Sequence, residues 1–162
     1  MKNKGIYSYF ILFFLCLSLA GCGGKAQRVE KEDISLTLPK NFEDVSLAAY
    51  AQDLDFLFNG PGVAVSGIRE EKSDFVISTI AGLQSYTFSL AAASGMTEPP
   101  DAWEKGYTFS YKAIIGGEEY TYLIASLQTE DAFWALQGYC LSGDFGKYEP
   151  ILWEIFTSAK SD

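Results

Sequence analysis

The stretch YTFSYKAIIGGEEYTYLIASL (residues 107–127) predicts the central element of the fold. On each side of Gly116-Gly117, aromatic or aliphatic residues alternate with more polar ones, a pattern typical of half-buried strands. Two glycines between such runs favour a two-residue hairpin turn. This turn fixes which residues face each other across the hairpin. The predicted opposite pairs are Ile115 with Glu118, Tyr111 with Tyr122, and Phe109 with Ile124.

The chain after the hairpin predicts a third strand and a closing helix. The run AFWALQGYCL (132–141) follows a short connection and continues an antiparallel meander. Cys140 shares a strand side with Trp134 and Leu136, so we expect a buried, inert thiol. Pro150 is expected in the first turn of the helix or at a kink. The apolar face of this helix contains Phe145, Tyr148, Leu152, Ile155, Phe156 and Ala159.

Shorter patterns precede the hairpin. ISLTL (34–38) alternates like a strand and ends at Pro39. LDFLF and VAVSGIREE flank the turn signal NGPG (59–62) and predict a strand pair. Residues 77–94 carry apolar side chains near helical spacing and predict a helix. Two prolines in TEPPDAW (97–103) predict a loop that includes Trp103.

This order of elements predicts an α+β fold in which an antiparallel β-sheet packs with helices. The segments ISLTLPKNF and DAFWALQGYCLSGDFGKYEPILWEIFTSAK resemble the opening strand and the closing strand and helix of the PsbP/Mog1-like superfamily. The resemblance extends over residues 34–159 by element order and implies a PsbP/Mog1-like α/β sandwich. It also implies a binding or assembly function, because that superfamily contains mainly non-catalytic proteins.

The amino terminus predicts a secretory signal. Lys2 and Lys4 precede a 15-residue apolar run (6–20), which is shorter than the roughly 20 residues that a membrane-crossing helix needs. Leu19-Ala20-Gly21-Cys22 resembles the box of bacterial lipoproteins. The resemblance implies a diacylglyceryl group on the Cys22 sulfur, cleavage after residue 21, and a fatty acyl chain such as palmitate on the new amino group. A non-lipidated secretory signal is the alternative.

The predicted organisation therefore has three parts: a signal peptide (1–21), a lipidated cysteine with a flexible tether (22–33), and a single domain (34–160). The chain carries a formal net charge of −9, and loss of Lys2 and Lys4 with the signal would make it −11. Such a charge disfavours nucleic acid as a partner. We expect a lipid-anchored protein that faces outside the cytoplasm, at the cell membrane or, in a cell with two membranes, at the outer membrane.

Few residues suggest chemistry. The sequence has no histidine, which excludes a Ser-His-Asp triad and a histidine metal site. Asp53 and Asp55 could share one side of a strand as a calcium site or an acid/base pair, although solvated surface explains them better. We expect no catalytic residues, no cofactor and no metal.

Two groups of aromatic residues are candidate contact sites. Trp103 is either an exposed contact or packs locally beside the prolines. The hairpin aromatics, with Tyr111 and Tyr122 among them, either line a ligand groove or form a core face against a helix. We expect a non-catalytic protein-binding or assembly module with an unknown protein partner. The alternative is a lipoprotein that binds a small ligand in a tyrosine-lined cleft beside the sheet.

Overall fold

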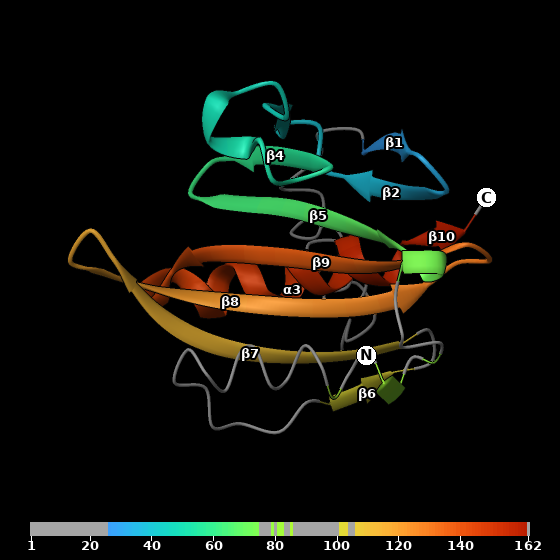
Figure 1. Cartoon of the computed structure of the whole chain (residues 1–162). Coiled ribbons are helices and arrows are strands. Elements are labelled where there is room, and N and C mark those ends of the chain that lie inside the picture. Colours follow the sequence, from blue (N-terminus) through green and yellow to red (C-terminus); the bar gives the residue numbers. More distant parts are fainter. Residues whose placement is uncertain are drawn as a thin grey trace, which may run out of the picture.

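In a computed structural model, the described part of the protein forms two antiparallel β-sheets and one α-helix (Figure 1). The structure describes residues 26–74, 79, 81, 82, 85, 101–103 and 106–161. The larger sheet has the strand order β3-β4-β5-β9-β8-β7-β6, and the smaller sheet has the order β1-β2-β10. Antiparallel sheets with a packed helix confirm the predicted α+β class.

The strands of the larger sheet are β3 (Glu43–Asp44), β4 (Phe56–Gly60), β5 (Val63–Glu71), β6 (Asp101–Trp103), β7 (Gly106–Ile115), β8 (Glu118–Gln128) and β9 (Ala132–Leu141). The smaller sheet contains β1 (Gln27–Lys31), β2 (Ile34–Leu38) and β10 (Lys160–Ser161). Short 3₁₀ turns are η1 (Ala49–Ala51), η2 (Lys72–Asp74) and η3 (Ser142–Asp144), and the helix is α3 (Phe145–Thr157).

The β7–β8 hairpin has the predicted register. Tyr111 lies opposite Tyr122 and Ile115 opposite Glu118. Gly116 and Gly117 have φ values of 62° and 90°, the left-handed conformation that a type I′ turn requires at both central positions. The pair of glycines therefore determines the position of the turn and the register of both strands.

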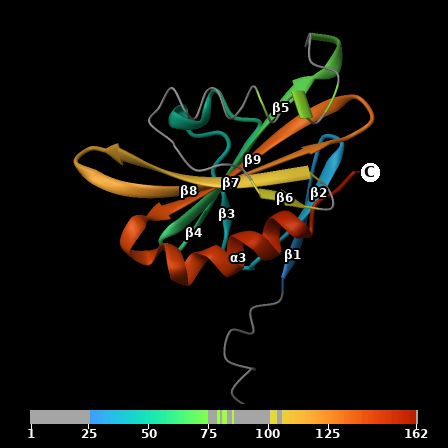
Figure 2. The ribbon, with the colours of Figure 1, turned by 90° about the horizontal axis from the view of Figure 1, so that it is seen from below.

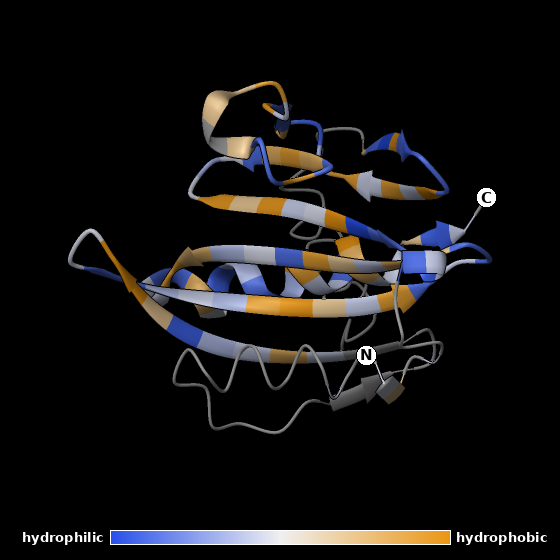
Figure 3. Cartoon of the chain, in the orientation of Figure 1, coloured by the Kyte–Doolittle hydropathy of each residue, from blue (hydrophilic) through white to orange (hydrophobic). Residues whose placement is uncertain are grey.

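Helix α3 covers one face of the larger sheet (Figure 2). Leu152, Ile155 and Phe156 are buried in one hydrophobic cluster with Trp134 and Leu136 of β9. In Figure 3 the hydrophobic colours run through the middle of β8 and the first half of β5, whereas the end of β5 near η2 is hydrophilic. The predicted apolar face of the last helix is thus the core-facing side.

A second, smaller cluster lies on the opposite face of the sheet. Ala51 of η1 packs there with Leu57 and Ala64, and Tyr139 contacts the same group. Figure 2 shows the segment around η1 on the side of the sheet opposite α3. The larger sheet is therefore buried on parts of both faces.

Two sequence predictions need correction. Strand β1 covers residues that we assigned to the flexible tether, so the folded unit begins before Ile34. Residues 101–103 form strand β6 rather than a loop, because they pair with β7. Of the two predicted places for Pro150, the first turn of α3 is excluded, because Pro150 lies further inside the helix. The helix predicted over residues 77–94 lies outside the described residues apart from isolated positions.

Within the described residues, no helix has the length and apolar character needed to cross a membrane.

Candidate functional site

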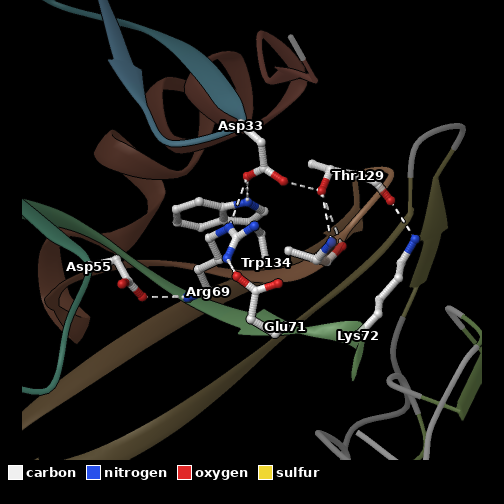
Figure 4. Close-up of polar contacts among 8 residues, drawn as sticks. Asp33, Asp55, Arg69, Glu71, Lys72, Thr129 and Trp134 are labelled. Carbon is white, nitrogen blue, oxygen red and sulfur yellow. Dashed lines mark hydrogen bonds and ion pairs between the residues drawn. The ribbon is translucent and has the colours of Figure 1, made fainter. Parts of the chain in front are cut away.

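A polar cluster joins the two sheets at the end of β5 (Figure 4). Asp33 follows β1 in the turn that leads into β2. The indole nitrogen of Trp134 donates to Asp33 Oδ1 over 2.7 Å, and Arg69 Nε lies 3.2 Å from the same oxygen. The hydroxyl of Thr129 donates to Asp33 Oδ2. One carboxylate thus receives hydrogen bonds from three different parts of the chain.

The charges in this cluster favour an ionised Asp33. Burial raises the pKa of the Asp33 carboxyl, but hydrogen bonds from Thr129, Trp134 and Arg69 outweigh it and hold the pKa below its ordinary value. The hydrogen bond to Glu71 and the pairing with Asp33 raise the pKa of Arg69. The Arg69 guanidinium therefore bridges Asp33 in the β1–β2 turn and Glu71 on its own strand, β5.

Other members of the cluster bind backbone groups. Lys72 Nζ donates to the carbonyl oxygens of Thr129, over 2.5 Å, and Glu130, over 2.8 Å. Asp55 accepts a hydrogen bond from the backbone N–H of Arg69. These contacts connect the β8–β9 turn and the segment before β4 to the end of β5. The cluster consequently has the chemistry of a structural joint, with its groups directed at one another.

The structure does not support a metal site at Asp53 and Asp55. Neither residue lies in a strand, because Asp53 is in a turn and Asp55 precedes β4, and both are exposed. The Asp55 carboxylate binds the backbone of Arg69. In the described parts of the chain, no group of three or more acidic or cysteine side chains could hold a metal ion. The expected shared strand side is therefore wrong.

The tyrosines form a ladder across three strands on the face opposite α3. Tyr111 stacks on Tyr122 with ring centroids 5.0 Å apart and an interplanar angle of 9°. Tyr122 stacks on Tyr139 at 5.0 Å and 24°. The ladder follows directly from the register, which places the three residues opposite one another on β7, β8 and β9. Strand spacing of about 4.8 Å sets the distance between the rings.

All three ladder tyrosines are half-buried. Burial, with smaller contributions from the neighbouring tyrosines, raises the pKa of Tyr122 to about 12. Burial also raises the pKa of Tyr111. The residues that face α3 from β8 are instead Leu123, Ala125 and Leu127. Helix α3 therefore packs on the other face of the sheet, away from the tyrosine ladder.

The remaining predicted site residues lie apart from one another. The backbone of Trp103 pairs with Gly106 at the start of β7, several residues from Tyr111. Cys22 lies outside the described residues. Cys140 is 2% exposed, and burial raises the pKa of its thiol, as expected for an inert core position.

Sequence analysis missed the cluster around Asp33. A usable signal was the predicted burial of Trp134, because a buried indole N–H needs an acceptor. The sequence could not identify that acceptor, since Asp33 lies 101 residues away along the chain.

Comparisons with known proteins establish the fold alone. No family model matches the chain, and no curated protein matches its sequence. The structure is similar to cyanobacterial PsbP (CyanoP) from Synechocystis sp. PCC 6803, with a TM-score of 0.52 and 13% identity over 90% of this chain and 99% of that one. The fold is therefore PsbP-like, an antiparallel α+β arrangement.

A second similar structure is a protein from Bacteroides thetaiotaomicron VPI-5482. Its TM-score is 0.56 and its identity 12%, and the match covers 86% of this chain but only 48% of that chain. The fold described here thus corresponds to about half of the longer protein.

Proposed function

We propose that this protein is a lipoprotein anchored through Cys22 outside the cytoplasm, whose PsbP-like domain is a non-catalytic protein-binding or assembly module. The observation that carries the anchor is the box Leu19-Ala20-Gly21-Cys22 directly after a short apolar segment. One acyl chain binds a membrane weakly, and two or more bind stably. Lipidation of Cys22 would therefore keep the domain at the membrane surface.

Two properties of the domain support a binding role over catalysis. The sequence contains no histidine, which removes the most common general base. The charged groups around Asp33 bind one another or backbone atoms of the fold. A domain whose best-defined polar groups stabilise its own architecture is suited to presenting a surface to a partner.

The tyrosine ladder favours a second candidate function. Tyr111, Tyr122 and Tyr139 present half-buried aromatic rings in one row, which suits capture of a small apolar or cationic molecule. Mild extraction followed by native mass spectrometry separates the two functions. A co-isolated protein supports the binding module, and a bound small molecule that Tyr122→Leu removes supports ligand capture.

The anchor is tested by changing Cys22 to Ala in the full-length chain. We expect Cys22→Ala to abolish incorporation of labelled fatty acid and to release the protein from the membrane fraction on cell fractionation. The matched control is Cys16→Ala, which changes a thiol inside the apolar segment and should leave both properties intact. Unchanged labelling and membrane retention of Cys22→Ala would refute the anchor.

A further inference from the structure

Within the described residues, the outer edge of strand β7 is unpaired along its second half. Strand β6 pairs only with residues 106–108, and among the described strands none lies beyond residues 110–115. Strand β8 occupies the other side of β7 over its whole length. A free edge of this length can accept one more strand.

The turn geometry identifies which backbone groups face outward. A two-residue type I′ loop is closed by a hydrogen-bonded pair, here Ile115 and Glu118. Hydrogen-bonded and non-hydrogen-bonded pairs alternate along an antiparallel ladder. The N–H and C=O groups of Ser110, Lys112 and Ile114 therefore point away from β8, toward the free edge.

The side chains along this edge are suited to contact. Ile114 is 77% exposed and Ile115 is 52% exposed, which is unusual for aliphatic residues in a sheet. Tyr111 stacks on Tyr122 with one ring face, and its other face is directed toward the edge of β7. The ring spacing of 5.0 Å is close to the distance between strands. A side chain on an added strand would thus continue the ladder.

The charge of the surroundings favours a basic occupant. Glu118 is exposed beside the tip of the hairpin, whereas Glu119 pairs with Lys112, and the whole chain carries a net charge of −9. An arginine guanidinium stacks on aromatic rings and is attracted by acidic surroundings. A second copy of this chain is a poorer occupant, because symmetric pairing of the edge about Lys112 would place two like charges opposite each other.

We propose that residues 110–114 of β7 bind an extended strand of a protein partner, with an arginine of that strand stacked on Tyr111. This inference rests on the proposed binding function and names the surface and the chemistry of the partner. The backbone groups of Ser110, Lys112 and Ile114 provide the affinity, and the ring face of Tyr111 that does not stack on Tyr122 provides the preference for arginine.

The test uses two synthetic peptides and the full-length protein in a non-ionic detergent. The peptides contain four Val-Arg or four Val-Glu repeats, have blocked ends and carry a fluorophore for anisotropy measurements. We expect the Val-Arg peptide to bind at least tenfold more tightly than the Val-Glu peptide. Tyr111→Leu should reduce that preference at least threefold.

Backbone variants test whether the peptide pairs with the edge. Lys112→Pro removes an outward N–H without removing a hydrogen bond to β8, and it should weaken binding at least tenfold. Lys112→Ala keeps the N–H and is the matched control, with binding expected within threefold of the unaltered protein. Ile114→Pro and Ile114→Ala repeat the comparison if Lys112→Pro lowers the thermal unfolding midpoint by more than a few degrees.

Several outcomes would overturn the inference. Equal binding of the two peptides, or equal binding by Lys112→Pro and Lys112→Ala, would contradict it. A dimer that Lys112→Pro dissociates in sedimentation would identify a second copy as the occupant instead. If Lys112→Pro still retains the protein partner that the unaltered chain retains from membranes, the β7 edge is not the binding surface, and the proposed binding function stands. If no partner is retained and neither peptide binds, the proposed edge and the proposed binding function are both refuted.

Discussion

At the scale of single residues, Asp33 does more for the fold than any candidate that the sequence suggested for chemistry. Its carboxylate accepts the indole N–H of the fully buried Trp134 and pairs with Arg69 of β5. These contacts join the turn after β1 to the larger sheet. A buried donor that loses its acceptor destabilises the folded state, so this position should be sensitive to substitution.

We expect Asp33→Asn to lower the free energy of unfolding by about 1–3 kcal/mol, because the charge that receives the Trp134 and Arg69 hydrogen bonds is lost. Urea unfolding followed by circular dichroism measures the change. Glu32→Gln removes a neighbouring exposed carboxylate and is the matched control, expected to change stability by less than about 0.5 kcal/mol. Equal stability of the two variants would contradict the role assigned to Asp33.

Acid should weaken the fold through two aspartates. Hydrogen bonds lower the pKa of Asp33 despite its burial. Burial raises the pKa of Asp44, but hydrogen bonds from Lys31 and Ser46 outweigh this effect and lower the pKa to about 2. A carboxyl with a lowered folded-state pKa stabilises the protein above its unfolded-state value and loses that contribution as pH falls. We therefore expect the unfolding midpoint to decrease from about pH 4 toward pH 2, and less steeply in Asp33→Asn.

At the scale of elements, the contact between α3 and β9 depends on a residue without a side chain. A Cβ added at Gly138 would lie 2.3 Å from a methyl carbon of Leu152, which is fully buried. The helix can thus approach β9 closely only where the strand carries glycine. This requirement explains why Gly138 stands in the middle of a strand, where glycine is otherwise unfavourable.

Gly138→Ala should lower the free energy of unfolding by about 1–3 kcal/mol through overpacking against Leu152. The matched control is Gly146→Ala in the first turn of α3, where an added Cβ meets nothing within 4 Å. That change should leave stability unchanged or raise it by up to about 1 kcal/mol, because alanine favours helix. Thermal and urea unfolding of both variants compare the two effects, and similar stability losses would contradict the packing argument.

The tyrosine ladder should be visible in an alkaline titration. Burial raises the pKa of Tyr122 to about 12, so its ionisation should appear as the last phase in absorbance at 295 nm. Tyr122→Phe should remove that phase, whereas Tyr120→Phe should leave it in place. Because the folded-state pKa lies above the ordinary value of about 10, this tyrosine's contribution to stability should be complete below pH 10 and decrease as pH rises toward 12. A last phase that survives Tyr122→Phe would contradict the assignment.

At the scale of the whole molecule, two sheets share one core. The sequence predicted the central strands of the larger sheet but missed strand β1 of the smaller sheet. The β7–β8 hairpin and β9 were predicted with the correct register or extent, because alternation and the glycine pair are local signals. Strand β1 has only one aliphatic residue, Val29, in the run QRVEK. Its pairing with β2 was therefore not visible in its composition.

The two proposed attachment points, Cys22 and the edge of β7, belong to different parts of the chain. Cys22 would hold the chain at a membrane through its lipid, five residues before β1 begins. The free edge of β7 belongs to the larger sheet, whereas β1 belongs to the smaller one. Loss of membrane retention in Cys22→Ala and loss of peptide binding in Lys112→Pro should consequently occur independently of each other.

The sequence by itself determined the features that depend on neighbouring residues: the hairpin turn, the alternation of the strands and the apolar face of α3. Tertiary structure alone decided which face of the sheet the tyrosines occupy and which carboxylate Trp134 would bind. Both depend on contacts between segments far apart in the chain. Period-2 alternation shows that two faces differ but not which element covers each, and a buried donor takes whichever acceptor the fold brings to it.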